Sequence, residues 1–396
     1  MKILVVCQYY YPEPFRIPDI CEELVKRGHK VTVVTGTPNY PMGKIYEGYE
    51  KGKRRYETIN GVKVHRCFTI GRKGGIIKRF LNYYSYAISS SIHVTFLKGD
   101  YDVVFVNQLS PIMMACAGIV YKQIHHKKLV MYCLDLWPAS LCAGGVKDSS
   151  IIYKVFHKLS AKIYHKADSI LVTSNMFKDY LHDELMISKR KTHYLPQYAE
   201  QLFEPDKCTK IPNEWTDLMF AGNIGKIQNV EIIIKAAYAL KDRKIRFHIV
   251  GDGTDVERLI SLKKRQKLDN VIFHGRQPLE KMPEYYSMAD AMLVTLDADP
   301  VLSLTLPGKV QTYMAAGKPI IGSINGETAE VIKKATCGFC AKANVEQDLI
   351  NSIISFAESD NKMQMGKNAK NYYDRFFSKN RFIDRLESAL IVNNKG

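Results

Sequence analysis

Residues 291–296 read AMLVTL and residues 306–321 read LPGKVQTYMAAGKPII. The first run is apolar throughout and predicts a buried β-strand. The second predicts a helix over Lys309–Ala316, because Gly317 is a typical residue beyond the C-terminal end of a helix. Pro319 then begins another apolar run. A strand, a helix and a strand in this order are typical of a parallel sheet that helices cover on both faces.

The same alternation extends over almost the whole chain. In the first half we expect strands at Ile3–Cys7, Val31–Thr35, Val62–Cys67, Val103–Val106, Leu129–Cys133 and Ser169–Thr173. In the second half we expect them at Leu218–Ala221, Arg246–Val250, Val271–Phe273, Ala291–Leu296 and Pro319–Gly322, followed by three or four helices and no further strand. The fold class is therefore α/β, with two Rossmann-like parallel-sheet domains.

A stretch with three prolines, residues 196–215, marks the boundary between these domains. We expect a first domain over residues 1–197 and a second over residues 213–377. Open α/β sheets bind ligands beyond the carboxyl ends of their strands, so two such sheets that face each other predict an interdomain cleft.

The composition limits the classes of partner. The net charge is +17, but the chain has neither arginine-rich arms nor zinc-finger spacing, so we expect no nucleic acid. An anionic membrane surface explains the charge better, and a generally basic proteome is the alternative. Nine scattered cysteines suggest a reducing compartment, and the single C-x-x-C at Cys337 and Cys340 predicts no zinc site. Met1-Lys2 leads directly into a strand, so no signal peptide is expected, and no apolar run has the length of a transmembrane helix.

Lys309 stands at the start of its expected helix, where a cation is unfavourable unless an anion lies between it and the helix N-terminus. Free backbone N–H groups together with a lysine suit a diphosphate. The alternative is an ordinary surface lysine.

Two further strand ends in the second half are rich in glycine. Gly222-Asn223-Ile224-Gly225-Lys226 follows one strand, and Gly251-Asp252-Gly253 follows the next. Glycine lets the backbone approach a ligand, and Lys226 can neutralise an anion. With Gly308-Lys309 these segments predict a nucleotide diphosphate site, although glycine at such turns also serves packing alone.

In the first half, Arg16 follows the first strand, and its fork suits a phosphate. Asp135 ends another strand beside Trp137, a position that suits a general base or acceptor-positioning group. The alternatives are a solvated arginine and a turn-capping aspartate. Asp297-Ala298-Asp299 resembles a metal-binding D-x-D, but a turn or a polar wall is the better interpretation of its position.

The segment from Arg72 to Lys98 is basic at both ends, with aromatic and aliphatic residues between them. A basic amphipathic helix can rest in the headgroup region of a membrane, so Arg72, Lys73, Lys78 and Arg79 are candidate membrane contacts. A helix packed on the sheet with a solvated basic face is the alternative.

Several motifs resemble those of family 4 glycosyltransferases. Arg27–Thr35 resembles their "R-G-H-x-V-T-V" run, and Asp168–Ser174 resembles their "A-D-x-I-x-x-x-S" strand. The Gly222–Gln228, Gly251–Gly253 and Leu306–Pro319 segments fit in order and spacing. Pro38–Pro41 and Asp135–Pro138 resemble a subgroup similar to fucosaminyltransferases of bacterial O-antigen and capsule assembly.

The resemblance implies the GT-B fold, with a C-terminal helix, residues 378–396, that packs back on the first domain. It also implies a sugar donor on the second domain, an acceptor on the first, retention at the anomeric carbon, and neither metal nor cofactor. The family usually carries two glutamates where this chain has Leu304 and Thr312. Thr312 can still hydrogen-bond, and Glu327 is a candidate substitute.

The expected reaction is hexosyl or N-acetylhexosaminyl transfer from a nucleotide diphosphate sugar, UDP-linked, to a lipid-linked saccharide. Lys309, Lys226 and Arg16 would stabilise the leaving diphosphate, and Asp135 would orient the acceptor hydroxyl. The expected location is the cytoplasmic face of the inner membrane. The alternatives are a nucleotide-sugar 2-epimerase of the same fold and a non-catalytic sugar-binding protein.

Overall fold

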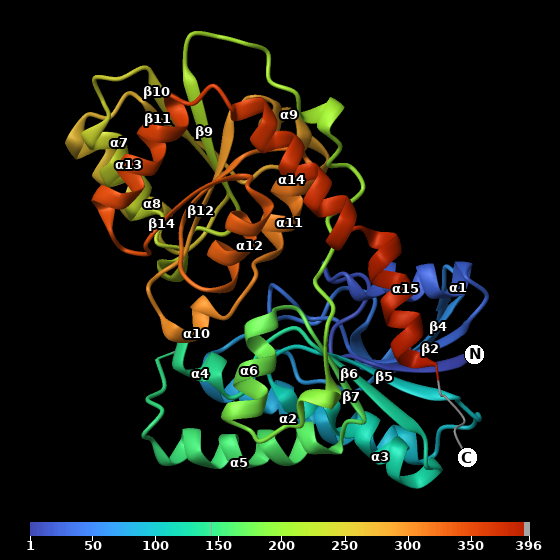
Figure 1. Cartoon of the computed structure of the whole chain (residues 1–396). Coiled ribbons are helices and arrows are strands. Elements are labelled where there is room, and N and C mark those ends of the chain that lie inside the picture. The colour runs from blue at the N-terminus through green and yellow to red at the C-terminus, as the bar shows by residue number, and fades with distance from the viewer. Residues whose placement is uncertain (144, 392–396) are drawn as a thin grey trace. The chain divides into compact units, whose positions relative to one another are not determined.

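A computed structural model describes residues 1–143 and 145–391 and divides the chain into two compact units (Figure 1). The first unit comprises Met1–Leu195 and the segment from Ile383 onward, and the second comprises Pro196–Phe382. Each unit is built around one sheet.

The first unit contains an eight-stranded sheet in the order β3-β4-β2-β1-β5-β6-β7-β8. All pairs are parallel except the antiparallel pair β3–β4. The strands are β1 Lys2–Val6, β2 Lys30–Gly36, β3 Tyr56–Ile59, β4 Val62–Cys67, β5 Val103–Gln108, β6 Lys128–Cys133, β7 Ser169–Val172 and β8 Thr192–Tyr194. The inner strands are buried on both faces, which explains their unbroken apolar sequences.

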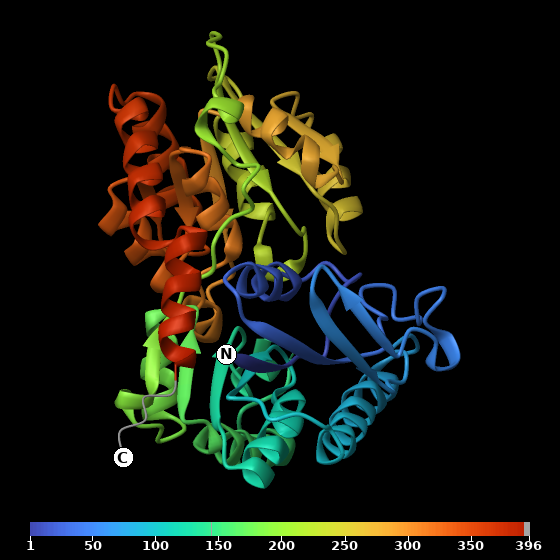
Figure 2. The ribbon, with the colours of Figure 1, turned by 90° about the vertical axis from the view of Figure 1, so that its right-hand side faces the viewer.

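Helices cover both faces of this sheet. They are α1 Ile17–Lys26, α2 Ile76–Thr95, α3 Cys116–His125, α4 Ala139–Ala143, α5 Ile151–Lys166 and α6 Asn175–Asp183. Figure 2 shows α1 on one face of the sheet and α2, α3 and α5 on the other. Helix α15, Lys379–Leu390, enters this unit at Ile383, and its Glu387 contacts Arg27 (Nη1–Oε2, 2.5 Å) and His29 (Nε2–Oε1, 2.7 Å). Residues 392–396 of the expected C-terminal helix lie outside the described residues.

The second unit contains a six-stranded parallel sheet in the order β11-β10-β9-β12-β13-β14. Its strands are β9 Thr216–Ala221, β10 Ile245–Val250, β11 Val271–Gly275, β12 Ala291–Thr295, β13 Ile320–Ser323 and β14 Gly338–Ala341. Its helices are α7 Glu231–Ala239, α8 Val256–Gln266, α9 Met282–Ser287, α10 Pro300–Ser303, α11 Gly308–Ala315, α12 Glu327–Ala335, α13 Glu346–Ala357 and α14 Lys362–Phe376.

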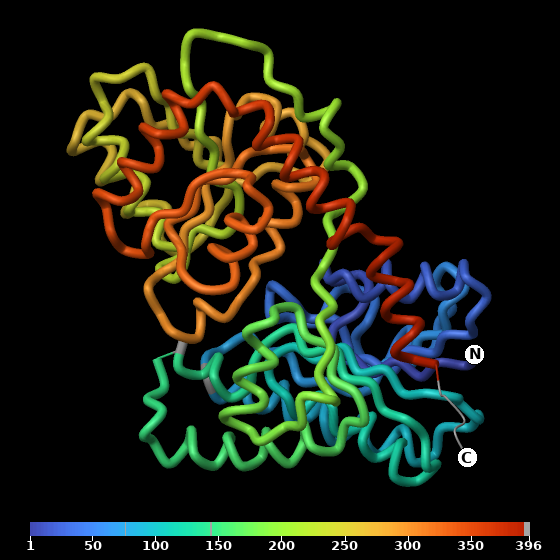
Figure 3. Tube along the Cα trace, viewed as in Figure 1, coloured from blue at the N-terminus to red at the C-terminus, as the bar shows by residue number. Residues whose placement is uncertain are grey.

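One apolar core joins β9, β10, β12 and β13 to α7, α8 and α13 on one face of the second sheet. Helices α11 and α14 lie on the other face (Figure 1). The segment from Pro196 to the start of β9 runs along the second unit (Figure 3). The Ala199 N–H donates to the Tyr373 hydroxyl at 3.2 Å, and the Phe203 ring stacks on Tyr286 at 5.0 Å.

The expectation of no strand after Gly322 is wrong. Strand β14 pairs in parallel with β13 at the edge of the sheet. Its four residues, GFCA, are too short and too mixed in polarity to stand out as an apolar run, and three of them are at least partly exposed. The short strands β3 and β8 were likewise not predicted, and they form the two edges of the first sheet.

Candidate functional site

Lys309 is the second residue of α11, and its side chain points back to the carboxyl end of β9. Its Nζ atom lies 3.9 Å from the centroid of the Phe220 ring. A Cβ atom added at Gly222, the residue after β9, would lie 2.8 Å from Nζ. Although the residue as a whole is partly exposed, Nζ is buried and has no hydrogen-bond partner among the described residues.

Burial lowers the pKa of the Lys309 ammonium to about 7, because removal from water disfavours the charged form. A buried donor without an acceptor is costly, and the positive end of the helix dipole adds to that cost. An anion bound at this point would remove both penalties. The anion site at Lys309 stays a prediction.

The helix that carries Lys309 is fixed to the sheet through Tyr313. The buried Tyr313 hydroxyl donates to the Ala221 carbonyl at 3.0 Å and accepts from the Ala221 N–H at 3.1 Å. This pair of bonds joins α11 to the last residue of β9, so Lys309 is held at the strand end.

The loop after β9 is closed by Gln228, in the short 3₁₀ helix Lys226–Gln228. Its side-chain oxygen accepts from the Gly225 N–H at 3.1 Å and from Asn223 Nδ2 at 3.0 Å. Lys226, at the start of this turn, is exposed. The loop thus presents one exposed lysine, whereas Asn223 is committed to holding the turn.

Gly251 and Gly253 have a packing role in the structure. A Cβ at Gly251 would lie 1.9 Å from the Gly222 oxygen, and one at Gly253 would lie 2.2 Å from the Ile224 oxygen. The two loops are also joined by a bond from the Ile224 N–H to the Asp252 carbonyl, 2.9 Å. The glycines let the loops after β9 and β10 pack closely together. The Asp252 carboxylate accepts a hydrogen bond from the Gly253 N–H at 2.8 Å.

Thr312 and Glu327 stand at two helices of the same unit. The Thr312 hydroxyl donates to the Gly308 carbonyl at 3.1 Å, so part of its hydrogen-bonding capacity is used within α11. Glu327 is the first residue of α12 and is buried. Gly326 before it has φ 68°, and a Cβ there would lie 2.0 Å from the Ser303 oxygen. Leu304 follows α10 and is partly exposed.

Asp297 and Asp299 are engaged in local structure. The Asp299 carboxylate caps α10 by accepting from the N–H groups of Val301 (2.8 Å) and Leu302 (3.0 Å). Asp297 accepts from the Ala298 N–H and from Asn344 Nδ2 at 2.6 Å. The described residues include no group of three His, Cys, Asp or Glu side chains placed to hold a metal ion. By their hydrogen bonds, Asp299 is a helix cap and Asp297 a turn residue.

In the first unit, Asp135 follows β6 and is held by Ser110, which follows β5. The Ser110 hydroxyl donates to Asp135 Oδ2 and accepts from Trp137 Nε1 at 2.5 Å. Burial raises the pKa of the Asp135 carboxyl, against the opposing effect of the Ser110 bond. Gln108 also donates to the Asp135 carbonyl at 3.0 Å. A carboxyl whose pKa is shifted in this way, at a strand end, fits an acid–base or acceptor-positioning role.

Arg16 lies directly before α1, in the segment that follows β1. The same segment contains Glu13, which sequence analysis missed. Glu13 is 3% exposed, and its carboxylate accepts from the N–H groups of Tyr10 (3.2 Å), Asn39 (2.8 Å) and Tyr40 (2.7 Å). Burial raises its pKa to about 7. Glu13 therefore anchors the Pro38–Pro41 motif to the segment after β1. The sequence feature that could have identified Glu13 is an acidic residue between two prolines after a strand.

The basic segment of the first unit leads into α2. Arg72 precedes the helix, and its guanidinium lies 4.5 Å from the centroid of the Tyr40 ring. Lys73, Lys78 and Arg79 are exposed. So are apolar residues along one side of α2, namely Ile77 (76% exposed), Leu81, Tyr84, Ile88 (58%) and Ile92. Within the described part of the chain, no helix has the length and hydropathy needed to cross a bilayer.

Comparison with known families defines the class of protein. Residues 17–197 match the family described as Glycosyltransferase Family 4, and residues 206–372 match the family described as Glycosyl transferases group 1. Neither match spans half of the chain, and together the two extend over most of both units. Its two parallel-sheet α/β units have the GT-B fold.

Individual relatives are identical to this chain at about a quarter of the aligned residues. The chain is 26% identical to the probable glycosyltransferase WbjE of Pseudomonas aeruginosa, over 74% of this chain and 76% of that one. It is 24% identical to the putative colanic acid biosynthesis glycosyl transferase WcaI of Escherichia coli, over 80% and 82% of the two chains. These relatives and both domains support a glycosyltransferase activity.

Solved structures share the fold over nearly the whole chain. Sucrose-phosphate synthase from Thermosynechococcus elongatus has a TM-score of 0.76 at 16% identity, with 98% of each chain covered. Anabaena HepE, solved in complex with UDP-glucose, has a TM-score of 0.70 at 15% identity, with 98% of this chain and 99% of that one covered.

Proposed function

We propose that this protein transfers a hexosyl or N-acetylhexosaminyl group, with retention, from a UDP-linked sugar to a lipid-linked saccharide. The pathway would be the synthesis of a bacterial surface polysaccharide such as an O-antigen or a capsule. The colanic acid biosynthesis in the name of the relative WcaI supports this setting, and HepE, solved with UDP-glucose, supports a UDP-linked donor. The subgroup motifs Pro38–Pro41 and Asp135–Pro138 favour a fucosaminyltransferase-like enzyme.

The buried, unpartnered Nζ of Lys309 is the observation that carries this proposal. Glycosyl transfer leaves a diphosphate whose negative charge grows as the bond to the sugar breaks. A preorganised cation at that point stabilises the transition state more than the ground state, and such electrostatic terms are usually the largest in catalysis. The N–H groups at the start of α11 would act with Lys309, and Lys226 would reach the diphosphate from the loop after β9.

We assign the donor ribose and sugar hydroxyls to Glu327 and Thr312. Glu327 would replace the paired glutamates that this chain lacks, and it stands at the N-terminus of α12. Gly222, Gly225, Gly251, Gly253 and Gly308 would shape the loops around the donor, together with Asn223 and Asp252. A phosphate contact is the role proposed for Arg16. Retention would follow from attack on the face that the leaving phosphate vacates, so no protein nucleophile is assigned.

Asp135 would position the acceptor hydroxyl. Its bond from Ser110 fixes the carboxylate, and Trp137, which bonds the same hydroxyl, would place an aromatic wall beside the acceptor. The raised pKa of Asp135 brings this carboxyl nearer to the range in which it can accept a proton at neutral pH.

The acceptor proposal includes a membrane contact through α2. Lys73, Lys78 and Arg79 supply positive charge beside the exposed apolar side chains of that helix. Each basic residue near an anionic surface contributes about 1 kcal/mol, so this segment would give reversible, salt-sensitive binding to the cytoplasmic face of the inner membrane. Arg72 would contribute less, because it packs on Tyr40.

The test is a screen of UDP-, GDP- and dTDP-linked sugars for release of the nucleotide diphosphate, with and without crude lipid-linked acceptor. Release that depends on a UDP-sugar and increases with acceptor supports the proposal. Conversion of a UDP-sugar to its 2-epimer without acceptor would instead identify an epimerase. Binding without turnover would identify a sugar-binding protein.

A further inference from the structure

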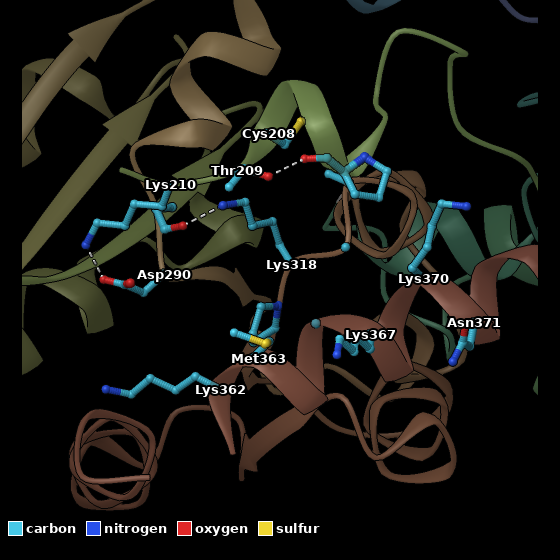
Figure 4. Close-up of a pocket in the computed structure, with 16 residues that line it drawn as sticks. Cys208, Thr209, Lys210, Asp290, Lys318, Lys362, Met363, Lys367, Lys370 and Asn371 are labelled. Carbon is cyan, nitrogen blue, oxygen red and sulfur yellow. Dashed lines mark hydrogen bonds and ion pairs between the residues drawn. The ribbon is translucent and has the colours of Figure 1, made fainter. Parts of the chain in front are cut away.

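A second concave surface of the second unit lies away from Lys309. It is a pocket of about 600 Å³ at the amino ends of the strands (Figure 4). Its walls come from Pro205 and residues 208–210 before β9, residues 289–290 before β12, residues 316–319 before β13, and α14 as far as Asn371. Lys309 stands at the other end of α11, whose eight residues span roughly 12 Å. The pocket is therefore distinct from the proposed donor site.

Five lysines and one aspartate line this pocket. Two of the lysines are neutralised by acids. Lys210 lies 2.5 Å from Asp290 and 2.8 Å from Asp217, and Lys370 lies 2.5 Å from Asp374 (Nζ–Oδ distances). The remaining three, Lys318, Lys362 and Lys367, have no carboxylate within ion-pair distance among the described residues.

These three lysines surround the pocket at different depths. Lys318 is 6% exposed, and its Nζ donates to the Ala289 carbonyl at 2.7 Å. Lys362 donates to the Ala357 carbonyl at 2.6 Å, and Lys367 is exposed at the rim. Burial lowers the pKa of Lys318 to about 8, and the nearby Asp290 offsets this effect only in part.

We propose that this pocket binds a small anion that carries several phosphate charges. Lysine ammonium groups bind phosphate as point charges, without the bidentate geometry of arginine. No aromatic side chain lines the pocket, so it offers no surface for stacking a nucleobase. Its volume suits a compact ligand, and its three lysines without a carboxylate at ion-pair distance match an anion with two or more negative charges.

The test uses inorganic tripolyphosphate as the probe, titrated into the full chain by calorimetry at low salt. The double variant Lys362→Gln, Lys367→Gln removes one partly buried and one exposed charge and is expected to weaken binding about tenfold. The matched control is Lys264→Gln, Lys281→Gln, which removes two exposed lysines of the same unit outside the pocket. The control is expected to stay within about twofold of the unmodified protein, and Lys309→Ala separates binding at the pocket from any binding of the probe at the proposed donor site.

Equal affinity for the unmodified protein and the pocket double variant would overturn the proposal. A loss seen in Lys309→Ala alone would also overturn it, because the anion would then bind at the end of α11 that carries Lys309. Lys318→Met supplies a third variant, in which loss of tripolyphosphate binding with an unchanged melting temperature supports the proposal. If Lys318→Met does not fold, the comparison of the pocket double variant with the control double variant decides whether the pocket binds the probe.

The same phosphate chemistry occurs in soluble anions and in lipid headgroups. Phosphatidylcholine vesicles with and without phosphatidic acid separate the two sources. Recruitment to phosphatidic acid that falls in the pocket double variant, relative to the control double variant, identifies a headgroup. Tripolyphosphate binding without any difference between the two double variants in vesicle recruitment identifies a soluble anion.

Discussion

Lys309 and Gly222 are in such close contact that any side chain at Gly222 would meet the lysine. A Cβ atom there would lie 2.8 Å from Nζ and 3.2 Å from Cε of Lys309. The residue that follows β9 and the start of α11 are thus in direct contact, and glycine at position 222 leaves room for the ammonium group. This contact makes the two residues interdependent.

Gly222→Ala is therefore expected to weaken UDP binding by about tenfold or more, because the methyl group displaces the Lys309 ammonium. Gly222 has φ 143°, so some loss of stability from backbone strain is also expected. Gly275→Ala is the matched control, since Gly275 has φ 66° but no atom near its added Cβ. UDP affinity by calorimetry and melting temperature should show strain in both variants and loss of affinity in Gly222→Ala alone.

The lowered pKa of Lys309 predicts a dependence of stability on pH. Between the folded pKa of about 7 and the ordinary value of 10.5, the unfolded chain binds more protons at this site than the folded chain does. The free energy of unfolding should therefore gain a rising contribution as pH increases through that range. Denaturant unfolding at pH 7 and pH 9 should show a smaller increase, or a larger decrease, for Lys309→Met than for the unmodified protein. The same pH difference in both proteins would mean that the ammonium is not buried in solution.

UDP binding at pH 8 should also take up a proton, since the anion favours the charged lysine. Calorimetry in two buffers of different ionisation enthalpy measures that uptake. Its persistence in Lys309→Met would place the linked proton elsewhere.

Asp135→Asn is expected to leave UDP affinity within about twofold and to lower transfer by roughly 10²–10⁴, the range for loss of a general acid–base group. Ser110→Ala should lower transfer less, because the carboxylate remains but loses its fixed orientation. Kinetics with saturating donor and varied acceptor measure both variants. A large loss of UDP affinity in Asp135→Asn would assign this residue to the donor or to the stability of the fold.

Much of the fold follows from apolar runs, because strands such as β5 and β12 are buried on both faces and carry polar residues only at their carboxyl ends. The edge strands β3, β8 and β14 could not be found in this way, since an edge strand is short and partly exposed. Lys309 could be singled out from its place at a helix start. That its Nζ has no partner, and that Ser110 holds Asp135, depend on contacts between segments distant in sequence, which local patterns do not encode.

Replacing Lys73, Lys78 and Arg79 with Gln is expected to reduce recovery with anionic vesicles at low salt several-fold. Recovery with neutral vesicles, and with anionic vesicles at high salt, should be low for both proteins, because salt screens exposed charge. A control that replaces Lys263, Lys264 and Arg265 on α8 removes the same charge from the second unit. If the two triple variants bind alike, net charge and not the α2 segment governs the attraction. Arg72→Gln should mainly lower stability, through loss of its contact with Tyr40.

The central claim is that Lys309 binds the diphosphate of the donor, and UDP affinity of Lys309→Ala measured by calorimetry tests it most directly. We expect UDP binding to weaken by at least about tenfold, and turnover with the donor identified in the screen to fall by about 10²–10³. Circular dichroism should show an unchanged fold, because the substitution removes a buried charge without a partner. Near-normal UDP affinity and turnover in Lys309→Ala would contradict the account and place the diphosphate elsewhere.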